Sequence, residues 1–204
     1  MQNRTLGKVG AAVAGVAVLA FAISMVIGLF VDMIFASCFA SMFIAIGYVL
    51  LAVGLYAANE SAEHKAAGLA SVAFAVVYAV IILLVYYAEC TTVRMNPGLS
   101  EEALSLISYG HLGSLFFNYD LLGYAFLGLS TFFAGFVVRP VTRGDKWLQR
   151  LLWVHGIFFV TCLILPMFPV FAPGTDAWIG TLVLEVWCVY FLPVCVLAYR
   201  YFRK

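Results

Sequence analysis

One acidic residue, Glu185, lies inside a long apolar segment, where an ionised side chain is costly. It follows Trp178 by seven residues, which places it about 10 Å below a membrane interface if the segment is helical. A charge at the centre of a spanning helix costs about 2.5–3.5 kcal/mol on insertion scales, so such a residue faces the bundle interior. We expect Glu185 either to be a protonated, hydrogen-bonded packing residue or to be a carboxyl that binds a ligand or couples to protons.

Three further polar residues, Tyr78, Asp120 and Tyr124, lie on apolar segments that could pack against the segment of Glu185. Asp120 and Tyr124 are four residues apart, so on a helix they share one face. Converging tyrosines and an acid could build a polar pocket, and they could equally form hydrogen bonds between helices. The predicted ligand-binding residues are Glu185, Tyr78, Tyr124, Asp120 and Arg94.

Arg94 is the one basic residue expected on the outer side of the membrane, where acidic residues gather. The acids mapped to that side are Asp32, Glu89, Glu101, Glu102, Asp120 and Asp176. A simple reason is that basic residues are excluded from outer segments while acids are not. A sharper interpretation is that Glu89 or Asp120 holds Arg94, whose guanidinium fork would suit an anionic head group.

No catalytic or cofactor motif is present. The sequence has no Walker A, HExxH or GxSxG pattern, so we predict no catalytic residue and an enzyme is not favoured. The five cysteines include no CxxC pair and the three histidines are scattered, so neither a metal nor a cofactor is expected. His155 follows Arg150 by five residues, so it is expected near the inner face of the membrane. At helical rise its depth differs from that of Glu185 by about 15 Å, so His155 and Glu185 are not expected to meet.

The composition indicates that most of this chain is surrounded by lipid. Hydrophobic types make up 65% of the 204 residues and charged types 10%, whereas an ordinary soluble domain carries about 25% charged residues. The net charge of +1 and the lack of a basic run argue against nucleic acid as a partner. The first apolar run, 9–31, is 23 residues long. A signal peptide has an apolar region of about 7–15 residues, so we interpret this run as a retained helix.

Apolar runs of about 20 residues predict an all-α, single-domain membrane bundle of six spanning helices over residues 1–204. The expected helices are 9–30, 33–57, 66–88, 116–138, 148–170 and 177–199. The run from 9 to 58 must fold back near Gly28 to Asp32, with Asp32 capping the second helix. Ser100 followed by Glu101 and Glu102 predicts a short extra helix in the loop between helices three and four.

The distribution of lysine and arginine predicts that both termini face the cytoplasm. With this topology ten of the eleven basic residues fall on the inner side, and Arg94 is the exception. The expected location is a cell membrane, most simply a bacterial inner membrane.

Two segments, 87–96 (YAECTTVRMN) and 118–138 (NYDLLGYAFLGLSTFFAGFVV), resemble uncharacterised six-helix bacterial membrane proteins of about this length. The resemblance covers about a third of the chain and implies a six-helix bundle but little about activity. The first functional hypothesis is binding or transport of a small or lipid-like molecule through an outward-facing cavity. The alternative is a non-enzymatic interaction, sensing or substrate-binding subunit of a larger membrane complex, with a membrane protein or a second copy as partner.

The predicted orientation can be tested with single cysteines in a variant that lacks the five native ones. Cysteines introduced at Ala62 and Gly144 should be protected from a membrane-impermeant thiol reagent added outside, because both positions lie in inner loops. A cysteine at Gly98 should react. The reverse labelling pattern would reject this topology.

Overall fold

The computed structural model describes residues 3–59, 61–171 and 177–203 and confirms a bundle of six long apolar helical segments. The helices are α1 (Asn3–Ile27), α2 (Ile34–Ala58), α3 (Lys65–Ala88), α4 (Glu101–Ile107), α5 (Leu115–Val137), α6 (Arg143–His155), α7 (Ile157–Ile164) and α8 (Ala177–Phe202). A π-helical turn, η1 (Glu89–Val93), continues α3, and two 3₁₀ turns, η2 (Leu165–Met167) and η3 (Pro169–Phe171), follow α7. The described part of the chain contains no β-strand.

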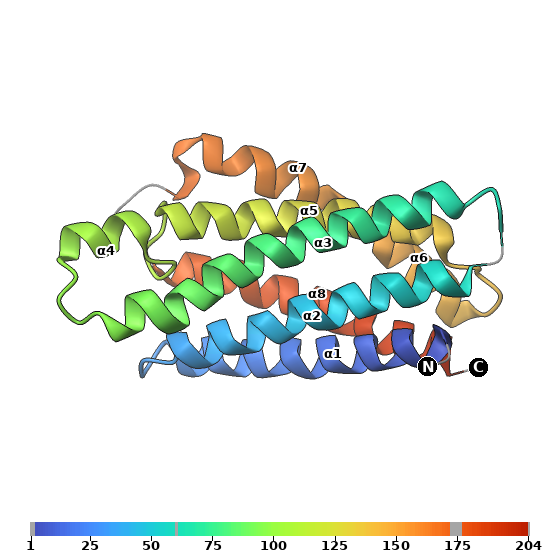
Figure 1. Ribbon diagram of the computed structural model, residues 1–204, viewed down its shortest axis with the longest axis horizontal. Helices are drawn as coiled ribbons and strands as arrows, with labels where there is room; N and C mark the ends of the chain where they lie inside the picture. The colour runs from blue at the N-terminus through green and yellow to red at the C-terminus, as the bar shows by residue number, and fades with distance from the viewer. Residues whose placement is uncertain (1–2, 60, 172–176, 204) are drawn as a thin grey trace.

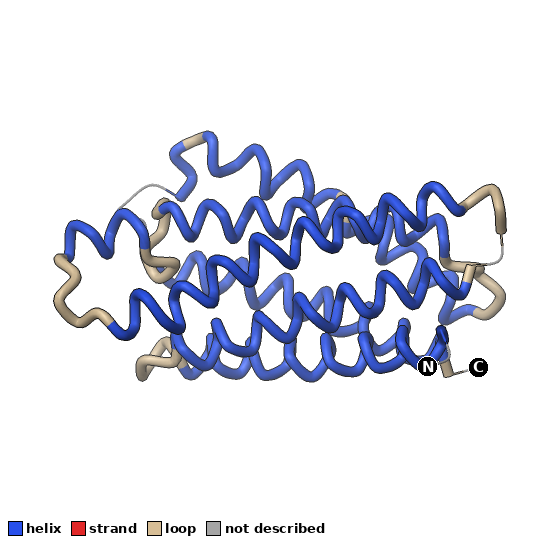
Figure 2. The backbone as a smooth tube through the Cα atoms, viewed as in Figure 1, coloured by secondary structure: helices blue, strands red, loops and turns tan. Residues whose placement is uncertain are grey.

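The spanning helices lie side by side along one long axis (Figures 1 and 2). The two ends of the bundle differ in charge. Both termini lie at one end, together with the connections after α2 and α5. We call this the basic end, because its described residues include Arg4, Lys65, Arg139, Arg143 and Arg203. The other end holds the turn after α1 and the α4 loop, and we call it the acidic end for Asp32, Glu89, Glu101 and Glu102. Asp176 and Lys204 lie outside the described residues.

Side chains at the starts of α2 and α4 bond the backbone as the sequence indicates, with one shift. The Asp32 carboxylate accepts a hydrogen bond of 3.1 Å from the backbone N–H of Ile34, the first residue of α2, but the N-cap position itself is Met33, one residue later than predicted. Ser100 caps α4, with its side chain accepting from the N–H of Ala103 at 3.2 Å. Glu101 and Glu102 stand in the first turn of α4, where their charge complements the helix dipole.

Glycines allow α1 and α2 to approach closely. A Cβ atom added at Gly47 would lie 2.5 Å from the backbone nitrogen of Ala14, and one at Gly10 would collide with the backbone of Leu51. Small residues at such spacing let helix backbones pack tightly in lipid, where no hydrophobic force drives helices together.

The sequence predicts the fifth span as a single helix over 148–170, and the structure differs from this prediction. It begins earlier, at Arg143, because Thr142 and Asp145 form a capping box at the start of α6. It then breaks at Gly156, and α7 ends at Ile164 just before Pro166, a residue that lacks the N–H a continuing helix needs. α7 packs against α5, whereas α8 packs against α1 and α6.

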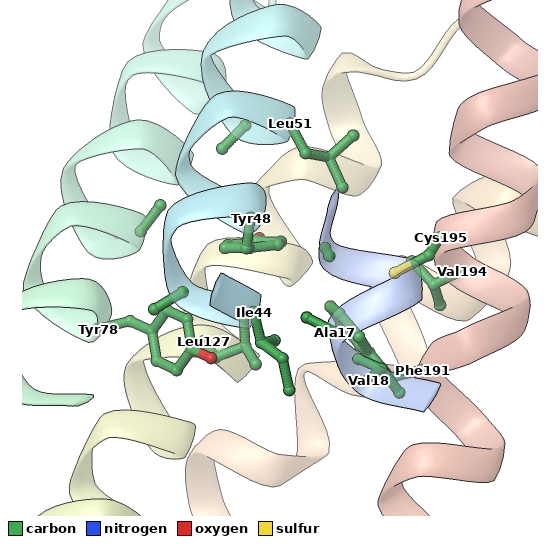
Figure 3. Close-up of a cluster of buried hydrophobic side chains, with 14 of the residues drawn as sticks. Ala17, Val18, Ile44, Tyr48, Leu51, Tyr78, Leu127, Phe191, Val194 and Cys195 are labelled. Atoms are coloured by element: carbon green, nitrogen blue, oxygen red, sulfur yellow. The ribbon is translucent and has the colours of Figure 1, made fainter. Parts of the chain in front are cut away.

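The buried core is built mainly by α1, α2, α3, α5 and α8 (Figure 3). Ile44, Leu127 and Phe191 are fully enclosed there, and so are two tyrosines, Tyr48 and Tyr78. The two phenols stand edge to face with ring centres 6.0 Å apart. Their hydroxyls therefore lie inside the protein, where each needs a partner.

Replacing Gly47 with valine should destabilise the bundle, because the added atoms meet the backbone of α1, which cannot move aside as a side chain can. Overpacking a core costs about 1–3 kcal/mol, so the melting temperature of the detergent-solubilised protein should fall. Gly98→Val is the matched control, since no atom lies within 4 Å of a Cβ at that position. Equal melting temperatures for the two variants would contradict the tight α1–α2 contact.

Candidate functional site

A cavity of about 210 Å³ opens at the acidic end of the bundle. Its wall is formed by the end of α1, the start of α2, the first turns of α8 and the segment 109–112. Polar groups from several of these elements line it, among them Ser24, Asp32, Ser37, Tyr109 and Thr181. The cavity therefore offers hydroxyls and one carboxylate to a solute that enters from this end.

Glu89 fixes the segment that carries Tyr109 against the cavity. It is 5% exposed, and its carboxylate accepts hydrogen bonds from the backbone N–H of Tyr109 and from the hydroxyl of Ser108. Ser114 donates a further hydrogen bond of 2.6 Å to the carbonyl oxygen of Ser108. Glu89 begins the π-helical turn η1, and such turns in proteins frequently occur at functional sites.

Tyr109 connects the cavity to a buried cluster beneath it. Its ring lies edge to face with that of Tyr86, with centres 5.2 Å apart, and it is 7% exposed. Burial raises the pKa of the Tyr109 phenol, and the nearby Asp120 carboxyl raises it further. The phenol therefore remains protonated at neutral pH and can donate a hydrogen bond.

The buried cluster consists of Asp120 and the tyrosines around it. Asp120 is 1% exposed, and its carboxyl lies within electrostatic range of Tyr78, Tyr86, Tyr109 and Tyr124. The Tyr86 hydroxyl is near enough to stabilise a negative charge on Asp120, but the two form no hydrogen bond of acceptable geometry. We call these five residues the Asp120 cluster.

Several polar atoms of the Asp120 cluster have no partner inside the protein. Asp120 Oδ1 and the hydroxyls of Tyr78, Tyr86 and Tyr124 are buried without a hydrogen bond, as is the hydroxyl of Ser41 on α2. Each buried polar atom left unpaired costs about 1–3 kcal/mol, and folded proteins contain few of them. A concentration of such atoms in one place indicates a site that water or a polar guest completes.

The chemistry of the Asp120 cluster suits a positively charged guest. No lysine or arginine in the described part of the chain contributes to the electrostatic surroundings of Asp120. Tyrosine rings attract cations through the negative charge on their faces, and cages of aromatic rings recognise ammonium groups in this way. An anion, in contrast, would meet a carboxyl with no compensating positive charge.

A second buried network lies deeper, around His155. This residue is fully buried, and its Nε2 accepts a hydrogen bond of 3.0 Å from the indole N–H of Trp187. The Thr131 hydroxyl donates to the carbonyl oxygen of Gly128, so it accepts from the Nδ1–H of His155 at 2.8 Å. These partners define a neutral imidazole with its proton on Nδ1.

Sequence reasoning missed this role for His155, because it counted depth from Arg150. α6 begins at Arg143, twelve residues before His155, which puts the imidazole about 18 Å along the helix. His155 therefore lies at the depth of Trp187, in the middle of α8. Its position near the inner face, expected from the sequence, is wrong.

Tyr48 forms a third buried contact between helices. Its hydroxyl donates to that of Ser130 at 2.8 Å, and Ser130 donates to the carbonyl oxygen of Ser71 at 2.6 Å. These bonds tie α2, α3 and α5 together just beside the Asp120 cluster, since Tyr48 also contacts Tyr78.

The structure brings three of the predicted site residues together, namely Asp120, Tyr124 and Tyr78, and leaves Glu185 apart. Trp187 contacts Tyr124, with ring centres 4.8 Å apart. Residues two apart on a helix point in nearly opposite directions, so Glu185 faces away from that contact. Its side chain is partly exposed, Oε1 is buried without a partner, and no hydrogen bond joins it to Tyr78 or Tyr124.

Arg94 is also outside the Asp120 cluster. Its guanidinium lies over the ring of Phe35, 4.2 Å from the ring centre, and the side chain is exposed. The expected contact with Glu89 or Asp120 is wrong, because Glu89 is engaged by Tyr109 and Ser108 while Asp120 points into the bundle.

Comparison with known proteins found no family model, no curated protein and no solved structure that matches this chain. The resemblance to six-helix bacterial membrane proteins therefore stays a prediction. Within the part of the chain that the structure describes, no three histidine, cysteine, aspartate or glutamate side chains lie close enough together to hold a metal ion. The geometry of the chain is therefore the basis for its function.

Replacing His155 with alanine should destabilise the protein, because it leaves the Trp187 indole N–H buried without an acceptor, whereas the Thr131 hydroxyl keeps its bond to Gly128. The orphaned N–H costs about 1–3 kcal/mol, so the melting temperature in detergent should fall clearly. His64→Ala is the control, because His64 sits in an exposed turn and makes one weak contact of 3.3 Å with Ser61. If the His155 variant melted like the His64 variant, the buried network would have no structural role.

Proposed function

We propose that this protein binds a small, positively charged organic molecule that enters at the acidic end and reaches the Asp120 cluster. The observation that carries the proposal is the buried carboxyl of Asp120, which has an unpaired oxygen and no basic neighbour in the described part of the chain. A buried charge is retained in proteins where a partner compensates it. A bound cation would supply that partner.

Tyr109 lies between the acidic-end cavity and the Asp120 cluster, so a ligand would reach the cluster past this residue. This residue lines the cavity on one side and contacts Tyr86 on the other. Its backbone N–H is held by Glu89, so the segment is fixed independently of the side-chain torsion. We infer that rotation of the Tyr109 ring joins the cavity to the Asp120 cluster.

Acidic residues around the entrance of the cavity attract cations toward the site. Asp32 lines the cavity, and Glu101 and Glu102 stand exposed on α4 at the same end. Acidic residues around an entrance raise the local concentration of cations. The predicted orientation places this entrance outside the cell, so the ligand would come from the outer medium.

The geometry supports binding more directly than transport. Transport also needs a path onward to the basic end, and the groups below the cluster are the paired network of His155 and the bond between Tyr48 and Ser130. The alternative function, a subunit that contacts another membrane protein, needs no cation at Asp120. A test of cation binding therefore distinguishes the proposed function from this alternative.

Choline and its uncharged isostere 3,3-dimethylbutan-1-ol provide a matched pair of probes. Choline should raise the melting temperature of the detergent-solubilised protein in a saturable way, because a ligand that binds only the folded state stabilises it. The neutral alcohol has nearly the same shape and should have no such effect. Asp120→Asn should abolish the response to choline, since the amide keeps the size but removes the charge.

Two further variants make the test specific. Glu102→Gln should respond to choline like the unmodified protein, because Glu102 is exposed on α4 and remote from the cluster. Glu185→Gln should also keep the response. If both probes act equally, or if Glu185→Gln loses the response while Asp120→Asn keeps it, the Asp120 site is rejected.

A further inference from the structure

A long apolar groove runs between α1 and α2 on the surface of the bundle, away from the Asp120 cluster. Its volume is about 840 Å³, and Ser24 is its one polar side chain. Small buried residues, Ala17 and Ala40, form its floor. Exposed side chains such as Val16 and Ile23 form the α1 wall, so the groove is lined by carbon atoms on both sides.

Three phenylalanines form the α2 wall of the groove. Phe35, Phe39 and Phe43 recur every fourth residue, so they stand one above another on one helical face. Their ring centres are 5.9 and 5.2 Å apart, and each side chain is more than 40% exposed. In a membrane this ladder of rings faces the acyl chains of lipids.

A positive charge lies beside the groove at the acidic end. The Arg94 guanidinium lies over the outermost ring of the ladder, Phe35, at 4.2 Å from its centre. No ion pair joins Arg94 to Glu89, the nearest acid in sequence, because that carboxylate is held by Tyr109 and Ser108. The donors of the guanidinium fork remain available to an anion at the level of the membrane interface.

We propose that this groove binds an anionic phospholipid, with its phosphate at Arg94 and one acyl chain along the phenylalanine ladder. Charge complementarity selects the head group, because Arg94 is the one basic residue at this end in the described chain. The α1 wall extends from Ala12 to Ser24, which is about 18 Å at helical rise. That length matches half of a hydrocarbon core of about 30 Å, the depth that one acyl chain occupies.

The shape of the groove favours a lipid over a transmembrane helix. Helices that associate in lipid bring small residues to the contact surface so that backbones can approach. Here the small residues lie at the bottom, beneath walls of phenylalanine and aliphatic side chains. A single flexible chain can reach that floor, whereas a helix about 10 Å wide cannot. This site is independent of the Asp120 cluster and takes a ligand of opposite charge.

Native mass spectrometry of the protein released from nanodiscs tests the proposal. The probes are phosphatidylglycerol and phosphatidylcholine with identical acyl chains, offered in equal amounts. The unmodified protein should retain phosphatidylglycerol in preference, and Arg94→Gln should lower that preference about tenfold, the loss expected for one charge-assisted contact. Arg143→Gln, at the exposed start of α6 on the basic end, should leave it unchanged.

A second pair of variants tests the groove itself. Ala20→Phe adds a ring inside the groove and should reduce retention of both lipids, whereas Leu19→Phe, on the neighbouring exposed position outside it, should not. Melting temperatures of all variants verify that they fold. Equal retention of the two lipids by the unmodified protein, or no effect of Arg94→Gln and Ala20→Phe, would overturn the proposal. A dimer that Ala20→Phe dissociates would assign the groove to a second copy of the chain and would overturn it too.

Discussion

The backbone contact of α1 with α2 is the constraint on which the other features of this bundle depend. Gly10 and Gly47 bring the two helices together in a way that no larger residue would permit. Toward the acidic end the same two helices border both the polar cavity and the apolar groove. The glycine contact therefore fixes the relative position of the two helices that form a wall of each.

Lipid cannot satisfy polar atoms, and this fact separates structural from functional polar residues here. His155, Thr131 and Trp187 form a closed set of hydrogen bonds, as do Tyr48 and Ser130 with the backbone of Ser71. Such sets fix helix positions and need nothing from outside. The Asp120 cluster is different. It is as buried as these networks, yet an oxygen of Asp120 and the hydroxyls of Tyr78, Tyr86 and Tyr124 have no hydrogen-bond partner.

Features that depend on local sequence could be predicted, and features that depend on tertiary partners could not. Hydropathy and capping residues gave the six spans, the turn at Asp32 and the short helix after Ser100, because each is set by residues close in the chain. The break at Gly156 depends on a tertiary contact, because a Cβ atom there would collide with Phe132 of α5. The depth of His155, in contrast, follows from the local capping box of Thr142 and Asp145, a signal that the sequence prediction left unused. For Asp120, Tyr78 and Tyr124 the helical face was predictable, but the partner of Arg94 was not, since Phe35 is remote in sequence.

Asp120 and Arg94 are an acid and a base at the same end of the bundle, yet they do not pair. Asp120 is enclosed by tyrosines, whereas Arg94 lies outside α2, stacked on Phe35 and open to its surroundings. If stability alone had shaped this end, pairing the two charges or replacing both with apolar residues would have lowered the cost of burying a lone carboxyl. Keeping them apart leaves one unpaired acid inside the bundle and one available base on its surface. Each is then a separate site for a partner of opposite charge, a cation within and an anionic lipid at the membrane face.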